Sequence, residues 1–519
     1  MSAFTYPGVY IEELPSGVHT ITGVATSIAA FVGWAAQGPV TEATLVESWS
    51  DFANQFGGLD SRSLLGYSVN QFFANGGSQA YIVRLVWTDA KTASSSDGGT
   101  PFTIGGLTLY AKSPGGWGSN IRITLTLASD PTRFSILVEQ LSTTGGPTKT
   151  LENFFNLSFN PADPQGMYVV AVIDSDSNYL TFINPATPTT PPGTPTGSPA
   201  AITQLTLGGG NDGTVLNPND GNFETALNTA GSGVSLLSTV FFNLLCVPGE
   251  TDGPTISTLQ GFCANAQNRA FYIVDAPQLA TYSGLNSTGP VGSTAGSITT
   301  APNAANSAYY FPWVTAPDPL AGNRPKPVPP CGFVAGIYAA TDGSRGVWKA
   351  PAGIDAGLTG VISLQTVLTD QQNGDLNTQG INCLRQFRVY GNVVWGARTL
   401  VGSDQAGSQW KYVPIRRFAL FLESSLYEGT QWVVFEPNDA TLWSQIRLNV
   451  GSFMQGLFLQ GAFQGTTPSQ AYFVKCDAEN NPQSSIDQGI VNILVGFAPL
   501  YPAEFVVIQI QQMAGQSQS

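Results

Sequence analysis

The residues that could carry out chemistry are few, and the single histidine, His19, decides most of the question. A Ser–His–Asp or Cys–His catalytic site needs an imidazole that titrates near neutral pH. His19 lies in an extended N-terminal stretch, far in sequence from any segment that predicts a pocket. We therefore expect an ordinary exposed histidine and a protein that is not an enzyme.

Other chemical groups are also poorly arranged for a site. The five cysteines are an odd number without a C-x-x-C spacing: Cys246, Cys263, Cys331, Cys383 and Cys476. Metal and redox sites need closely spaced ligands, so we expect buried, reduced thiols. The glycine-rich TLGGGNDGT (206–214) lacks the lysine of a phosphate-binding loop. The sequence predicts no metal and no cofactor.

The composition favours self-association. Only 10% of the residues are charged, against roughly 25% in ordinary soluble proteins. With 42% hydrophobic residues, this predicts a surface largely covered by further copies of the chain. A surface of Ser, Thr, Asn, Gln and Gly is the open alternative. The net charge of −14 argues against a nucleic-acid partner.

Nothing in the sequence predicts export or membrane insertion. No apolar run reaches the roughly 18 residues of a membrane span, and the start MSAFTYPGVY has neither part of a signal peptide. We therefore expect synthesis in the cytoplasm without a signal peptide and no direct membrane insertion.

Positive charge gathers in one segment, residues 381–420. Its six basic residues against one aspartate, Asp404, make a local net charge of +5, and they are Arg385, Arg388, Arg398, Lys411, Arg416 and Arg417. One interpretation is a lock against acidic surface of a neighbouring subunit or a second partner. The other is a basic face paired within the same chain.

Hydrophobic spacing predicts a mixed α/β, multidomain fold. Residues 26–88 read as strand, two helices and strand, with Ser48 or Ser50 capping the first helix and Gly57 ending it. A β-rich module follows, in which MYVVAVID (167–174) is predicted to be a strand. From residue 201 strand, helix and strand indicate a parallel crossover unit.

The last third predicts two amphipathic helices. RRFALFLESSLYEG (416–429) ends at a glycine, and Asn438 or Asp439 caps the helix that starts at residue 440. We expect WVVFEPND (432–439), between them, to form a strand and a turn, and QAYFVKCD and GIVNILVGF to supply two short strands.

Both chain ends predict strands without a local partner. The N-terminal one contains Val9, Tyr10, Ile11 and Glu12, and the C-terminal one contains Phe505, Val506, Val507, Ile508 and Ile510. A strand needs a neighbour for its backbone N–H and C=O groups, so we expect each to pair outside its own surroundings.

Several uncommon blocks follow one another along the chain and are densest in the last ~150 residues: YPGVYIEE, SPGGWGSN, YYFPWV, VPPCGFVAGIYAATDGSRGVWKAPAG, GNVVWGARTLVG, WKYVPIRRFALFLESSLYEGTQWVVFEPNDATLW, GAFQGTTPSQAYFVKCD and VGFAPLYPAEFVVIQI. In content and order these blocks resemble contractile tail sheath proteins of bacteriophages and phage-tail-like injection particles. The resemblance implies a subunit of stacked six-membered rings that surround an inner tube and contract to drive it through a target envelope.

The resemblance also implies a layout and partners. A core sheath domain would form from both chain ends around a central subtilisin-like α/β module, with these segments: N-terminal linker arm 1–25, first part of the core 26–88, inserted outer β-rich domain 89–200, central α/β domain 201–350, C-terminal core 351–502 and C-terminal linker arm 503–519. Its partners would be other sheath subunits, the inner tube protein, the baseplate and a tail-terminator or cap protein.

In the family the two arms add strands to a shared sheet of neighbouring subunits. Arg416 and Arg417, by resemblance, would face the inner tube or dock the acidic N-terminal arm. The protein would be made in the bacterial cytoplasm and belong to a phage tail or injection particle. Two other function classes remain: a self-assembling surface-layer or adhesive protein, and a hydrolase on the central module, against which the absence of histidine from that region counts.

Overall fold

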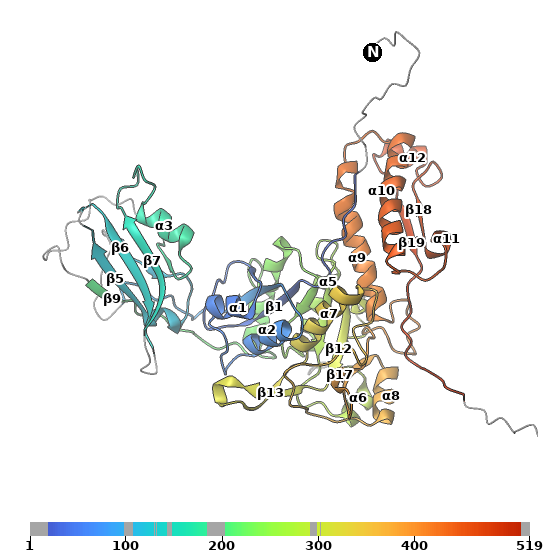
Figure 1. The fold of residues 1–519 in the computed structure, drawn as a ribbon, viewed down its shortest axis with the longest axis horizontal. Helices are drawn as coiled ribbons and strands as arrows, with labels where there is room; N and C mark the ends of the chain where they lie inside the picture. Colours follow the sequence, from blue (N-terminus) through green and yellow to red (C-terminus); the bar gives the residue numbers. More distant parts are fainter. Residues whose placement is uncertain are drawn as a thin grey trace, which may run out of the picture. The chain divides into compact units, whose positions relative to one another are not determined.

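A computed structural model of the chain describes residues 19–97, 107–128, 130, 132–142, 148–183, 203–290, 298–300 and 303–509. The fold is mixed α/β with several sheets (Figure 1). It divides into two compact units. One, the helical unit, comprises residues 1–25, 345–350 and 414–519, and the other, the sheet unit, comprises residues 26–344 and 351–413.

The sheet unit is built on an eight-stranded sheet. Its order is β17 (Gly391–Val394), β16 (Ile381–Phe387), β12 (Ser307–Phe311), β11 (Phe271–Asp275), β10 (Leu244–Cys246), β1 (Ala29–Trp34), β3 (Ala80–Leu85) and β2 (Thr44–Val46). The six strands from β16 to β3 are parallel, as the crossover pattern predicts. Strands from 26–88, 201–350 and 351–413 therefore share one sheet.

Helices cover both faces of this sheet. On one face, Val32 of β1 packs in a core with α4 (Gly221–Asn228), α5 (Gly253–Ala264) and α8 (Asp370–Thr378). On the other, the ring of Phe31 lies 5.5 Å from that of Phe72 in α2 (Leu65–Ala74). Because successive side chains of a strand point to opposite faces, strands buried on both sides are continuously apolar. This accounts for the run AAFVGW in β1.

The helix α2 and a further helix, α7 (Cys331–Arg345), approach each other closely. A Cβ on Gly332 of α7 would lie 2.3 Å from the backbone oxygen of Ser68 in α2. Only glycine allows the two backbones to meet at this distance. The remaining short elements of the unit are α1 (Trp49–Phe56), α6 (Tyr282–Thr288) and a sheet of β13 (Val314–Asp318), β14 (Arg324–Val328) and β15 (Ser363–Leu364).

The helix α1 confirms the predicted boundaries. Ser48, rather than Ser50, is its N-cap and accepts a hydrogen bond from the backbone N–H of Asp51. Gly57 ends the helix with φ at 87°, a conformation that glycine adopts without strain.

The inserted β module has a four-stranded antiparallel sheet. Its order is β7 (Lys149–Leu157), β6 (Phe134–Gln140), β5 (Ile121–Leu127) and β9 (Thr203–Thr206), beside a short pair of β4 (Tyr110–Ala111) and β8 (Leu180–Thr181). The strand prediction for residues 167–174 is wrong, because Val169–Asp176 form the helix α3. Val169 and Ile173 are buried in the module's core, and this packing outweighs the strand preference of β-branched residues.

The helical unit joins α9 (Val413–Gly429) and α10 (Ala440–Leu459) to two short strands, β18 (Tyr472–Lys475) and β19 (Leu494–Phe497), with α11 (Pro468–Ala471) and α12 (Gln483–Asp487) nearby (Figure 1). Asp439 caps α10. Both chain ends contribute, since Ile21 lies in the core and the backbone N–H of Val24 donates to Ser425 Oγ at 3.1 Å.

One strand prediction for this unit is wrong. Between α9 and α10 the chain forms a 3₁₀ turn at Gln431–Val433 and an irregular loop, rather than a strand. From residue 500 to 509 no strand is formed with any described residue, and the pairing of this segment with another chain stays a prediction. Val9, Tyr10, Ile11, Glu12 and Ile510 lie outside the described residues.

Candidate functional site

The carboxyl ends of parallel strands are where α/β enzymes place reactive groups, and here Asp275 occupies the end of β11. Its carboxylate accepts hydrogen bonds from the backbone N–H groups of Gly249 at 3.0 Å and Cys331 at 2.8 Å. Because Cys331 is the first residue of α7, Asp275 stabilises the N-terminus of that helix. Burial raises the pKa of Asp275 to about 6, although both donors lower it. Asp275 therefore has a structural role.

Glu250 lies beside the end of β10 and is fully buried. Burial raises the pKa of Glu250 to about 7, and one carboxylate oxygen accepts the backbone N–H of Asp252 at 2.7 Å. The other carboxylate oxygen has no hydrogen-bond partner among the described residues. Such a group favours its protonated form near neutral pH, which makes it a pH-sensitive element of the core.

A cavity of about 550 Å³ opens at this edge, between β1 and β10. The described residues that line it include no His, Cys, Asp or Glu. Its two cationic residues are engaged, since Arg62 pairs with Asp60 and Asp212 and the Nζ of Lys326 donates to the carbonyl oxygen of Ser61 at 3.1 Å.

The single histidine is engaged in packing. The ring of His19 stacks on that of Trp432 within the helical unit, with centroids 4.2 Å apart, although His19 remains exposed. No group of three or more His, Cys, Asp and Glu that could hold a metal occurs in the part of the chain that the structure describes. Its five cysteines are all buried and free.

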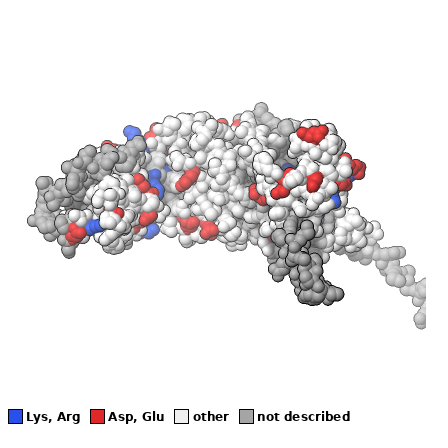
Figure 2. Space-filling model, turned by 90° about the horizontal axis from the view of Figure 1, so that it is seen from above, with Lys and Arg blue, Asp and Glu red and all other residues white. Residues whose placement is uncertain are grey.

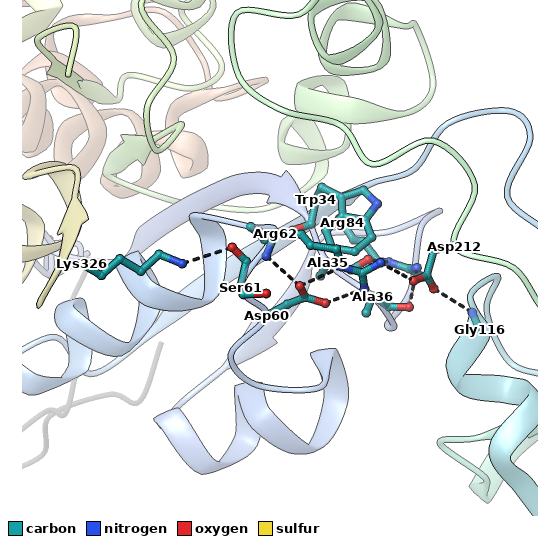
Figure 3. A network of polar contacts seen from close by, with 11 residues as sticks. Trp34, Ala35, Ala36, Asp60, Ser61, Arg62, Arg84, Gly116, Asp212 and Lys326 are labelled. Carbon is teal, nitrogen blue, oxygen red and sulfur yellow. Dashed lines mark hydrogen bonds and ion pairs between the residues drawn. The ribbon is translucent and has the colours of Figure 1, made fainter. Parts of the chain in front are cut away.

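A polar network ties the β module to the sheet (Figure 3). Arg62 lies over the ring of Trp34 and forms ion pairs with Asp60 at 2.7 Å and Asp212 at 2.9 Å. Asp212 in turn accepts the backbone N–H of Gly116, in the module, at 2.7 Å. This ion pair is partly exposed, so it orients the module more than it stabilises it.

Arg84 of β3 forms the buried part of this network. Its guanidinium donates to four backbone carbonyl oxygens, those of Ala35 at 2.7 Å, Gly38 at 2.7 Å, Ala36 at 3.0 Å and Pro114 at 2.8 Å. The planar fork of arginine can satisfy several carbonyls at once, which a lysine could not do. Arg84 was not among the residues predicted from the sequence, although an arginine within a continuously apolar strand is a recognisable signal.

The six basic residues of 381–420 differ in their surroundings. Arg385 pairs with Asp370, Arg398 and Lys411 pair with Asp404, and Arg416 pairs with Glu423. Two of the acidic partners, Asp370 and Glu423, lie just outside the segment. Hydrogen bonds from Lys411 lower the pKa of Asp404, although burial opposes them. The ion pairs fit the alternative of a basic face paired within its own chain.

The six basic residues also differ in how deeply they are buried. Arg398 is fully buried, and Arg385 and Arg417 are 7% and 4% exposed. Arg388 is exposed and makes no ion pair or hydrogen bond with any described residue. Of the six, Arg388 is the one that is both exposed and without an ion pair to a described residue.

The C-terminal segment is apolar and uncovered. Phe505, Val506, Val507 and Ile508 are 77%, 80%, 81% and 79% exposed, respectively. Both strands of the β18–β19 sheet also lack a second strand partner among the described residues, and Phe473 and Leu494 on them are half exposed. An open sheet edge and an exposed β-prone segment occur in the same chain.

Phe435, in the loop between α9 and α10, was also missed. It is fully exposed and has φ at 71°, a left-handed conformation that is strained for a bulky residue. The Pro-Asn-Asp at residues 437–439 marks a turn, but no sequence pattern predicts which residue of the loop adopts positive φ.

Comparison with known proteins agrees with this picture. Residues 228–400 match the phage tail sheath protein central domain, and residues 405–513 match the phage tail sheath C-terminal domain. The tail sheath protein of Vibrio phage KVP40 is 27% identical over 188 residues, which are 36% of this chain and 26% of that protein. The tail sheath protein of Enterobacteria phage T4 is 28% identical over 163 residues, 31% of this chain and 23% of that protein.

A putative prophage major tail sheath protein of Pseudomonas aeruginosa (strain UCBPP-PA14) is 26% identical over 265 residues, 50% of this chain and 62% of that protein. The matched parts thus span from about a quarter to under two thirds of these curated relatives.

Solved structures share the fold across nearly the whole chain. The PVC sheath complex of an extracellular contractile injection system, in its contracted state, has a TM-score of 0.58 at 23% identity, covering 99% of both chains. The contracted helical sheath of the anti-feeding prophage has a TM-score of 0.59 at 22% identity, covering 98% of this chain and 100% of the other. A sheath tail protein from Listeria innocua has a TM-score of 0.59 at 14% identity, covering 92% and 96%.

The two domain matches and the shared fold place the chain among tail sheath proteins. The chain belongs to the phage tail sheath family, whose two domain matches cover more than half of it.

Proposed function

We propose that the chain polymerises as stacked six-membered rings around an inner tube and contracts to drive that tube through a target envelope. The observation that carries the proposal is the exposed apolar segment Phe505–Ile508 together with the open two-stranded sheet β18–β19. An exposed β-prone segment is stabilised when it adds a strand to a neighbour's sheet edge.

The exchange of chain ends would make the lattice continuous. The C-terminal arm 503–519 of one subunit, and the N-terminal arm 1–25 of another, would extend the β18–β19 sheet of a third. Main-chain hydrogen bonds of this kind can persist while the attached bodies rotate. The sheath could then shorten without dissociating, with energy from the difference between two packings rather than from a nucleotide.

The layout expected for this family completes the proposal. The central sheet would be the subtilisin-like module, without its catalytic function, and the β module 89–200 would be an outer insertion. Because strands of 26–88 and 351–413 belong to the central sheet, the core sheath domain would be the helical unit, which keeps residues 414–502 of the expected C-terminal core. Its partners would be further sheath subunits, an inner tube protein, a baseplate and a terminator or cap protein.

The setting would be a phage tail or a phage-tail-like particle made in the bacterial cytoplasm. Two of the similar solved structures are of the anti-feeding prophage baseplate, which supports a baseplate partner. No helix within the described ranges is long and apolar enough to cross a membrane. The face in Figure 2 is mostly uncharged, which supports extensive contact with further copies.

A non-enzymatic role is part of the proposal. Asp275 is held by two backbone N–H groups, and the described lining of the cavity includes no His, Cys, Asp or Glu. These observations favour a sheath over a hydrolase on the central module. A surface-layer or adhesive protein would assemble as flat arrays instead of tubes, and electron microscopy separates the two.

The test compares the full chain with a chain that ends before Ala503, by negative-stain electron microscopy. We expect hollow tubes from the full chain and none after truncation. A control of unchanged length, Val506→Asp with Ile508→Asp, should also lose the tubes, while Gln511→Asp with Gln512→Asp should keep them. Compact monomers from the full chain at every concentration would contradict the proposal.

A further inference from the structure

Phe435 lies at the tip of a loop that is held on both sides. The backbone N–H of Val434 donates to the carbonyl of Gln431 at 3.2 Å, and that of Glu436 donates to the carbonyl of Val433 at 3.2 Å. Asn438 accepts the indole N–H of Trp443 at 2.8 Å, which fixes the loop against α10. The loop is thus held by hydrogen bonds while the Phe435 side chain at its tip is fully in solvent.

The exposure of this apolar tip costs free energy, and no packing against the described residues offsets that cost. Val434 is 59% exposed and Phe435 fully so, and the positive φ of Phe435 adds backbone strain. Strain of this kind clusters at functional sites, where the surrounding structure maintains it. Since Phe435 is fully exposed and packs against none of the described residues, we look for its benefit in a contact with another molecule.

The same tip is acidic. Glu428, in the last turn of α9, and Glu436 are exposed and form no ion pair with a described residue. The last turn of α9 has no basic residue, so the negative end of the helix dipole is also uncompensated. The tip therefore offers an apolar surface in a negative field, which attracts a cationic and apolar partner.

A surface of that kind exists at the turn between β16 and β17. Phe387 pairs with Gly391, so Arg388, Val389 and Tyr390 form a three-residue hairpin loop. Gly391, with φ at 71°, provides the left-handed position that such a loop requires. Val389 is 83% and Tyr390 53% exposed, and Arg388 has no partner among the described residues.

The two tips are complementary in charge and in apolar content. Val434–Phe435–Glu436 presents two apolar side chains and a carboxylate, and Arg388–Val389–Tyr390 presents two apolar side chains and a guanidinium. Because each chain carries one of each, the contact is heterologous, with different surfaces on the two partners. Contacts of this type propagate into rings or helical arrays.

We propose that the Val434–Phe435–Glu436 loop of one subunit docks on the Arg388–Val389–Tyr390 hairpin of a second copy. This inference rests on the proposed polymerisation. The contact between the loop and the hairpin, called the joint, is a second contact between subunits and is separate from the exchange of chain ends. Its charged pair sets the orientation of the subunits, and its apolar side chains supply the buried surface.

Charge exchange tests the joint. Arg388→Glu and Glu436→Arg should each raise the protein concentration needed for tube formation about tenfold or more, because each places like charges together. The double variant should restore tube formation toward the wild-type concentration. Lys91→Glu, which makes the same charge change at an exposed lysine without an ion pair to any described residue, is the matched control.

Cysteine cross-linking gives an independent readout. The five native cysteines are buried, so Val389→Cys and Phe435→Cys introduce the accessible thiols. Oxidised tubes of the double variant should yield a ladder of covalent oligomers, and mixed tubes of the two single variants should yield dimers only.

The outcomes separate this inference from the proposed function. If the wild-type chain forms no tubes, the proposed function fails and the joint fails with it. If tubes form but both charge reversals assemble at the wild-type concentration, or the paired cysteines do not cross-link in tubes, the joint is refuted while the sheath function stands.

Discussion

The guanidinium of Arg84 donates a 2.8 Å hydrogen bond to the carbonyl oxygen of Pro114, and so joins the central sheet to the inserted β module. Three further carbonyls, on Ala35, Ala36 and Gly38, accept from the same side chain. A single buried cation thereby satisfies the backbone at the point where the chain leaves the sheet, a place where carbonyls would otherwise be buried without donors.

Replacing Arg84 by methionine should destabilise the sheet unit by about 3 kcal/mol or more, since buried carbonyls lose donors. Arg84→Lys should recover only part of this, because an ammonium group cannot reproduce the planar fork. Urea denaturation followed by tryptophan fluorescence measures both. Equal stability of Arg84→Met and wild type would show that the carbonyls find other donors.

The ion pair of Arg62 with Asp212 should contribute much less. Its arginine side chain is 45% exposed, so Arg62→Gln should reduce the free energy of unfolding by less than about 1 kcal/mol. Limited proteolysis is the sharper measurement: we expect faster cleavage near residues 88–97 in the variant, because the module is held less firmly. An unchanged cleavage rate would mean that Arg84, and not the Arg62–Asp212 ion pair, holds the module in its orientation.

Glu250 should make stability depend on pH. Burial raises its pKa to about 7 from 4.5, so between these values the folded state binds more protons than the unfolded state. Stability from this group is therefore greatest below about pH 4.5 and falls as the pH rises through about 7. Asp275, with its pKa raised to about 6, acts in the same direction.

Glu250→Gln removes this dependence for one group. The difference in urea midpoint, variant minus wild type, should be larger at pH 8 than at pH 5. Glu428→Gln, at an exposed position, is the control and should show the same difference from wild type at both. A Glu250→Gln difference that is also independent of pH would mean that Glu250 ionises normally.

Phe435→Gly should stabilise the isolated subunit by about 1 kcal/mol, because glycine adopts positive φ without strain. Phe435→Ala keeps the strain and, since the ring is fully exposed, should leave stability nearly unchanged. Thermal unfolding of dilute monomer compares the two. A loss of stability in both would indicate that the ring packs within its own chain.

Local patterns predicted much of the fold correctly. The apolar run of β1, the cap at Ser48 with the stop at Gly57, and the crossover from β10 through α5 to β11 are all encoded by neighbouring residues. Prediction failed where packing decides: residues 169–176 are helical because Val169 and Ile173 fill the module's core.

By itself, the sequence determined the α/β class, the scarcity of catalytic groups and the family, because these depend on residue types, spacing and order. Only the tertiary structure decided which of the six basic residues remain available, since ion pairs such as that of Arg385 with Asp370 join residues from different elements. It also decided that Phe435 is exposed and strained and that Phe505–Ile508 lacks a partner in the described part of its own chain. Exposure and pairing are properties of the folded chain as a whole, and no local pattern specifies them.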